Sequence, residues 1–169
     1  LIQVADALAT AHRHHVVHGD LKPNNIMLSE TADGRELVRV HDFTIAPTLM
    51  AASTSSEPLA RYLHGHGVVD YLAPEIFSTS GALNSRMDIY AFGAVAYHLL
   101  TGEPPFVGDP GKVMESHLKI DPVPPSRRSG AEDVPPELDE IVMGCLEKNP
   151  VDRHKSIDEV ARRLRALEL

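Results

Sequence analysis

Tryptophan is absent from this sequence, cysteine occurs once, and only 5% of the residues are aromatic. The single Cys145 cannot form an internal disulfide, so the fold does not require an oxidising compartment and we expect a cytoplasmic protein. Long hydrophobic runs are also lacking. The most apolar stretch, residues 89–100, is interrupted by His98 and is too short to cross a bilayer. A membrane anchor outside this segment remains compatible with these observations.

Basic residues are outnumbered, with 16 Lys and Arg against 24 Asp and Glu, for a net charge of -8. A general nucleic-acid-binding protein needs a basic face to neutralise phosphates, so this composition argues against a nucleic-acid partner. A length of 169 residues suits one domain with a substantial core and is too short for two. The chain begins inside an amphipathic pattern with Leu1, which suggests a fragment of a longer protein.

Apolar residues recur at helical spacing over much of the chain, which predicts a mainly α-helical fold. A strongly apolar helix with Ile89, Phe92, Gly93, Ala96, Leu99 and Leu100 should lie in the core. Further helices are predicted over 112–119, over 138–146, and from the capping-box pattern Ser156-Ile157-Asp158-Glu159 onward. The buried faces of the first and last helices are expected to comprise Leu1, Val4, Ala5, Leu8, Ala11, Ile157, Val160, Ala161, Leu164 and Leu167.

Two short apolar runs, 26–28 and 37–41, flank a loop that contains Asp33-Gly34. This dipeptide is a strong turn signal, so we predict a small β-hairpin. Periodicity is lost between Thr44 and Asp70, and this stretch is predicted to form a long surface loop. Loops of such length inside a compact domain are usually functional.

Polar residues with catalytic potential lie between the first helix and the hairpin, in His18-Gly19-Asp20-Leu21-Lys22-Pro23-Asn24-Asn25. A carboxylate here could orient a hydroxyl and accept its proton, and an amide oxygen five residues later could hold magnesium. The stretch resembles the catalytic loop of protein kinases, with the spacing of that family's Asp-Leu-x-x-x-Asn motif. An Asn- and Pro-rich turn that happens to carry an aspartate is the structural alternative.

Four further motifs follow in the order that the kinase family requires. Asp42-Phe43-Thr44 resembles the Asp-Phe-Gly triplet, and Tyr71-Leu72-Ala73-Pro74-Glu75 resembles the Ala-Pro-Glu end of the activation segment. Asp88 to Gly93 resembles the start of the central helix, and Asn149 to Arg153 resembles the late motif that carries an arginine. The chain is therefore similar to the C-terminal lobe of a serine/threonine kinase of bacterial type, spanning 1–169 without an N-terminal lobe.

The resemblance implies a role for each matched residue. Asp20 and Lys22 would be catalytic, with Lys22 also contacting the transferred phosphate of ATP, and Asn25 with Asp42 would bind Mg²⁺. Two structural roles are also implied. Asp88 would hydrogen-bond the backbone near His18 and Gly19, and Glu75 would form a buried ion pair with Arg153. The partner implied by this family is a protein substrate.

Three residues depart from the family pattern. Gly19 replaces the arginine that would grip a phosphate on the activation loop, so phosphorylation of Ser53, Thr54, Ser55 or Ser56 should not control activity. Thr44 replaces a glycine, and Val68 stands where a threonine hydroxyl would link Asp20 and Lys22. Together these changes weaken the case for an efficient kinase.

Three functions stay open on these residues: a protein kinase that is active in the full-length protein, a pseudokinase that binds or scaffolds a partner, and a truncated product without independent function. The retained polar residues favour the first. The isolated chain lacks a glycine-rich loop, a strand lysine and a helix glutamate, so by itself it should phosphorylate nothing at a useful rate.

Several other residues invite functional interpretations that we do not favour. We expect His12, His14 and His15 to form a solvated helix end rather than a metal site, because no Cys, His or Asp cluster of ligand spacing completes one. Arg162, Arg163 and Arg165 are expected on a solvated helix face. Cys145 is expected to be an inert core thiol.

Overall fold

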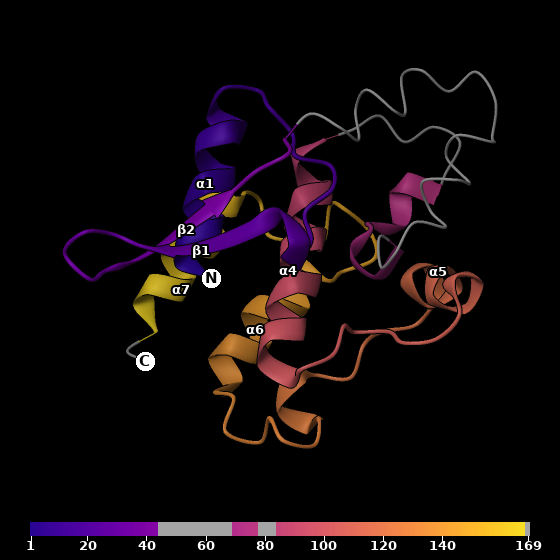
Figure 1. Ribbon diagram of the computed structural model, residues 1–169. Coiled ribbons are helices and arrows are strands. Elements are labelled where there is room, and N and C mark those ends of the chain that lie inside the picture. The colour runs from indigo at the N-terminus through magenta and orange to yellow at the C-terminus, as the bar shows by residue number, and fades with distance from the viewer. Residues whose placement is uncertain (44–68, 78–83, 168–169) are drawn as a thin grey trace.

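The computed structural model describes residues 1–43, 69–77 and 84–167, and it is mainly helical (Figure 1). Its α-helices are α1 (Ile2–Arg13), α4 (Ser85–Thr101), α5 (Pro110–Lys119), α6 (Pro136–Cys145) and α7 (Ile157–Ala166). Short 3₁₀ helices are η1 (Pro23–Asn25), η2 (Val69–Tyr71), η3 (Pro74–Phe77) and η4 (Pro125–Arg127). Among the described helices, none is long and apolar enough to cross a membrane.

The predicted hairpin is confirmed. Strands β1 (Ile26–Glu30) and β2 (Glu36–Val40) pair antiparallel, with Ile26 opposite Val40 and Glu30 opposite Glu36. Gly34 in the connecting loop has a φ of 80°, a left-handed conformation that favours glycine. The hairpin packs against α1, which also lies beside α7 (Figure 1). Strand β1 begins directly after η1, so the hairpin holds the end of the 18–25 segment in place.

Helix α4 passes through the centre of the molecule (Figure 1). Its N-cap is Asn84, whose side chain accepts a hydrogen bond from the Arg86 N–H, and its C-cap is Gly102, where φ is 80°. All residues from Met87 to Tyr97 are buried, as a helix apolar on every side requires. The predicted core position of this helix is confirmed, but the prediction is wrong for Leu99, which is 63% exposed where α4 leaves the core.

The buried faces of the terminal helices largely match the prediction. In α1 the buried residues include Ala9, which we did not expect, whereas Leu1 and Ala11 are only partly buried. In α7 the four predicted residues from Ile157 to Leu164 are buried, and Leu167 is partly buried. Ser156 caps α7 by accepting from the Glu159 N–H, while the Glu159 carboxylate accepts from the Lys155 N–H.

Candidate active site

Three of the four predicted site residues meet on one buried loop. The Lys22 Nζ lies 2.7 Å from Asp20 Oδ2, and the Asn25 Nδ2 donates to the Asp20 carbonyl at 2.8 Å and to Oδ2 at 3.4 Å. Asp20 and Asn25 are 6% and 5% exposed. Within the described residues, neither Asp20 Oδ1 nor Asn25 Oδ1 accepts a hydrogen bond, so both oxygens are available to a ligand.

Local chemistry explains this arrangement. Pro23 opens the 3₁₀ helix η1, where its missing N–H has no partner to lose, and the turn carries Asn25 back toward Asp20. The His18 ring supports the loop from below: its Nδ1 accepts from the Asp20 N–H at 3.2 Å, and its Nε2 donates to the His41 carbonyl at 3.0 Å. Because Nδ1 accepts, the neutral tautomer must carry its proton on Nε2.

Full burial of His18 keeps this ring neutral. Burial lowers the pKa of His18 as the largest effect, and the nearby Asp88 carboxylate opposes it by favouring the imidazolium. A neutral ring can both accept at Nδ1 and donate at Nε2, whereas an imidazolium can only donate. The backbone of Asp20 is therefore positioned by a histidine that has to remain uncharged.

Asp42, the fourth predicted residue, lies on a segment that contacts the catalytic loop. The His41 N–H donates to the Asn25 carbonyl at 3.0 Å, and the Phe43 ring centroid lies 4.6 Å from that of His18. Asp42 has a φ of 64°, a conformation uncommon outside glycine and often found at functional sites. Its carboxylate is 48% exposed and lies 3.1 Å from His41 Nδ1, without a hydrogen bond to Asp20 or Asn25.

The predicted role of Asp88 is confirmed. Its buried carboxylate accepts from the backbone N–H groups of His18 and Gly19, both at 2.8 Å. Gly19 has a φ of 75°, so the position occupied by arginine in the family pattern here has a conformation that favours glycine. The Asp88 carboxylate therefore fixes Gly19 in a backbone conformation that glycine adopts without strain.

The expectation for His12 is wrong. Its Nε2 lies 2.7 Å from Asp88 Oδ2 and its side chain is only 11% exposed, so it supports the catalytic loop through Asp88. A signal was present, because His12 follows Leu8 by four residues and therefore continues the buried face of α1. His14 and His15 are exposed, as expected. The described residues contain no group of three or more His, Cys, Asp or Glu side chains suited to a metal ion.

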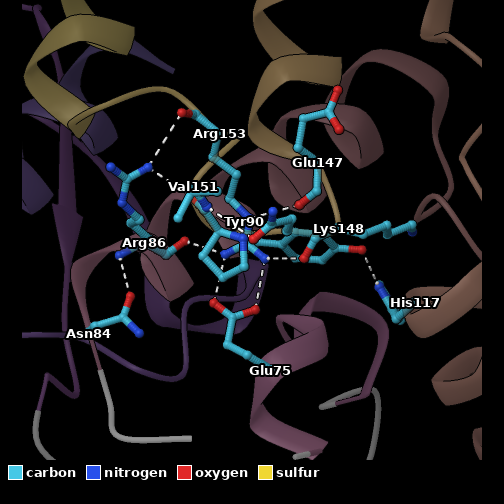
Figure 2. Close-up of polar contacts among 11 residues, drawn as sticks. Glu75, Asn84, Arg86, Tyr90, His117, Glu147, Lys148, Val151 and Arg153 are labelled. Atoms are coloured by element: carbon cyan, nitrogen blue, oxygen red, sulfur yellow. Dashed lines mark hydrogen bonds and ion pairs between the residues drawn. The ribbon is translucent and has the colours of Figure 1, made fainter.

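A second polar cluster joins residues 75 and 153, and the predicted ion pair is confirmed (Figure 2). The Arg153 Nη1 and Nη2 atoms each lie 2.7 Å from one Glu75 carboxylate oxygen. The other Arg153 N–H groups donate to the carbonyls of Glu147, Arg86 and Lys148. All five guanidinium donors are therefore satisfied, and the guanidinium carbon lies 4.9 Å from the Tyr90 ring centroid.

The remaining predictions divide between the described residues and those outside them. Cys145 is fully buried, and burial raises the pKa of its thiol, as expected of an inert thiol. Arg163 and Arg165 form partly exposed ion pairs with Glu140 and Asp6. Residues Thr44, Ser53 to Ser56 and Val68 lie outside the described ranges.

A helical domain whose buried loop unites Asp20, Lys22 and Asn25, and whose central helix anchors that loop, has the organisation of a protein kinase. The family model of the protein kinase domain matches residues 1–163, and the chain belongs to this family. The chain is 40% identical over 161 residues to serine/threonine-protein kinase PknB of Mycolicibacterium smegmatis, covering 95% of this chain and 24% of that protein. It is 36% identical over 168 residues to serine/threonine-protein kinase pkn3 of Myxococcus xanthus, covering 98% and 30%.

These relatives are bacterial serine/threonine kinases, as the sequence resemblance suggested. The chain spans about a quarter of the length of PknB from Mycolicibacterium smegmatis and from Mycobacterium leprae.

Proposed function

We propose that residues 1–169 form the C-terminal lobe of a kinase domain that transfers the γ-phosphoryl group of ATP to a serine or threonine hydroxyl of a protein substrate. The observation that carries this proposal is the meeting of Lys22 and Asn25 on one carboxylate oxygen of Asp20. The carboxylate of Asp20, the ammonium of Lys22 and the amide of Asn25 therefore lie close enough together to contact a single phosphoryl group.

Each residue has a distinct task in the proposed reaction. Asp20 orients the substrate hydroxyl and accepts its proton, for which Oδ1 has no competing hydrogen bond among the described residues. Lys22 offsets negative charge on the transferred group, and its Nζ is already fixed 2.7 Å from Asp20. Phosphoryl transfer depends mainly on such positioning and charge neutralisation, so these two residues would supply much of the rate.

The residues present fit Mg²⁺ with ATP. Magnesium prefers oxygen ligands and commonly takes one or two from the protein, with the rest from water and substrate phosphates. Asn25 uses Nδ2 to bond Asp20, which leaves its Oδ1 for a metal, and the Asp42 carboxylate is half exposed. Bound magnesium would neutralise charge on the phosphates, and Asn25 and Asp42 are the residues that would hold it.

Radiolabelled phosphoryl transfer by the full-length protein tests this proposal. Asp20→Asn should reduce kcat by about 10²- to 10⁴-fold, because an amide cannot accept the proton. The matched control is Asp33→Asn, whose carboxylate is 56% exposed on the hairpin loop and should be dispensable. Equal rates for wild type and Asp20→Asn, with both proteins folded, would contradict the kinase function.

A pseudokinase is the second candidate, and the departures at Thr44 and Val68 favour it. Thermal stabilisation separates nucleotide binding from catalysis, because a ligand that binds the folded state must stabilise it. For the kinase we expect ATP to raise the Tm of the full-length protein more with Mg²⁺ than without it. Asp42→Asn should remove that difference. Stabilisation without any phosphoryl transfer would instead support a binding module.

A further inference from the structure

Helix α5 is attached to the core by very few buried side chains. Only Val113 and His117 are buried in α5, whereas α4 buries eleven residues. The helix packs against η2 and η3, the two short elements of residues 69–77. Because one of its two buried residues is a histidine, the attachment of α5 depends on a side chain that can acquire a charge.

His117 occupies an apolar site with a single hydrogen bond. Its Nδ1 lies 2.8 Å from the Tyr90 hydroxyl (Figure 2). Its ring also packs edge-on with Phe106, with the ring centroids 5.0 Å apart. The ring is fully buried. Its Nε2 is the only buried side-chain nitrogen or oxygen without a hydrogen-bond partner in the part of the chain that the structure describes.

The charged group that acts on His117 is Lys148, and Arg153 lies against the Tyr90 ring that His117 contacts. Lys148 Nζ lies 4.7 Å from the Phe106 centroid and 5.9 Å from that of Tyr90, and Arg153 lies 4.9 Å from the Tyr90 centroid. In η3, Glu75 is engaged with Arg153. The charged residues of α5 itself, Lys112, Glu115 and Lys119, are exposed.

The backbone of Asp70, in η2, raises the pKa of His117 slightly against the larger effects of burial and Lys148. It does not form a hydrogen bond to Nε2. No carboxylate therefore pairs with His117 among the described residues.

A proton on His117 would be poorly tolerated in this site. With both ring nitrogens protonated, the ring would bury a positive charge near Lys148, and Nδ1 could no longer accept from the Tyr90 hydroxyl. The N–H on Nε2 has no acceptor among the described residues. Burial first, and Lys148 second, lower the pKa of His117 to about 3. When α5 leaves the core, the ring is solvated and regains its ordinary pKa of 6.5. Stability from the neutral ring is therefore complete above pH 6.5 and decreases as the pH falls.

We propose that protonation of His117 releases helix α5 from the core, so that α5 and its contacts with residues 69–77 respond to acid while the rest of the domain stays folded. Release would expose Tyr90 and Phe106, which His117 covers. The proposal concerns the fold alone and holds whether or not the full-length protein transfers phosphate.

Other titratable neighbours do not reproduce this response. Burial lowers the pKa of Lys148 to about 8, so Lys148 remains charged between pH 7 and pH 5. Burial raises the pKa of the Asp70 carboxyl, so its protonation favours the folded state as the pH falls. His117 is the neighbour whose protonation in this range opposes docking.

Amide hydrogen exchange of the full-length protein tests the proposal. From the ordinary and lowered pKa of His117, the released population of α5 should rise about 20-fold between pH 7 and pH 5, after correction for intrinsic exchange rates. Peptides from α7, which contains no histidine, should change much less. An α5 response no larger than that of α7 would overturn the proposal without any variant.

Two variants identify the histidine. His117→Asn keeps an acceptor for the Tyr90 hydroxyl and cannot titrate, so its α5 exchange should lose the pH response. His154→Asn is the matched control, since His154 also makes one hydrogen bond, to the Ile141 carbonyl, but lies away from α5. A persistent response in folded His117→Asn would overturn the assignment. If His117→Asn does not fold, the wild-type comparison of α5 with α7 decides.

Discussion

The Glu75–Arg153 cluster and the Asp20–Asn25 loop both place a carboxylate beside a cation, but among the described residues the cluster has no free acceptor and the loop does. In the cluster, both Glu75 oxygens and all five Arg153 donors are bonded inside the protein. In the loop, Asp20 and Asn25 each retain an oxygen that no described residue bonds. A buried ionic group whose partners are complete has no acceptor left for a ligand, and removal of one partner costs stability. One with a remaining acceptor can bind a ligand, which is the basis of the proposed reaction.

Among the variants that test this difference, we expect Arg153→Met to have the largest effect on stability. This variant removes the guanidinium that pairs with the largely buried Glu75 carboxylate, and the free energy of unfolding should fall by about 3–5 kcal/mol. Arg163→Met is the control, since its pair with Glu140 is exposed and should be worth less than about 1 kcal/mol. Urea unfolding of the domain measures both, and equal losses would show that completion of the partners is not what matters.

Asp88→Asn tests whether the anchor and the reactive loop are coupled. An amide cannot accept from the N–H groups of His18, Gly19 and His12 together, and we expect a loss of about 1.5–3 kcal/mol. Because Gly19 precedes Asp20, kcat should decrease with little change in KM for the peptide substrate. Unfolding and steady-state kinetics on the same preparation check this. A stable but slow variant would separate positioning from folding.

The neutral His18 ring makes the stability of the Asp20–Asn25 loop depend on pH. Its pKa is lowered in the folded state, so the folded state binds fewer protons than the unfolded chain below pH 6.5. The free energy of unfolding should therefore decrease as the pH falls below 6.5. His18→Asn should reduce this slope, and His117 contributes to the slope that remains. Denaturant titrations of both proteins from pH 7.5 to pH 5 provide the measurement; identical slopes would rule out a contribution from His18.

The smallest effect is expected outside the described residues. Combined replacement of Ser53, Thr54, Ser55 and Ser56 by alanine should leave the activity of the full-length protein within about twofold, because Gly19 offers no guanidinium to a phosphate. The phosphoryl-transfer assay measures this directly. Abolished activity would mean that another cation performs the task of the missing arginine.

Much of the fold and part of the candidate site could be predicted because local patterns carried them. The Asp33-Gly34 turn predicted the hairpin, and the capping residues Ser156 and Glu159 predicted the start of α7. The motif order also predicted the partners of Asp88 and Arg153. These features depend on short spacing or on matched motifs, so they are readable without coordinates.

The errors share a different cause. His12 was assigned to solvent because it lies in a histidine-rich helix end, yet its partner Asp88 is 76 residues away. Leu99 was assigned to the core because its helix is apolar, although α4 has left the core at that point. The spacing of His12 from Leu8 placed it on the buried face of α1, but no local pattern identifies its partner Asp88 or the point at which α4 leaves the core. Both depend on which element packs against the residue.

The order of amino acids by itself determined the helical class, the hairpin and the identity of the polar residues that serve the proposed reaction, because these follow from periodicity, turn chemistry and motif spacing. Only the tertiary structure decided that His12 and Asp88 support one loop. It also decided that the five donors of Arg153 find five acceptors, and that His117 is buried against Tyr90 and Phe106 near Lys148. Burial and the choice of hydrogen-bond partners depend on which distant segments pack together, so they cannot be read from local sequence patterns alone.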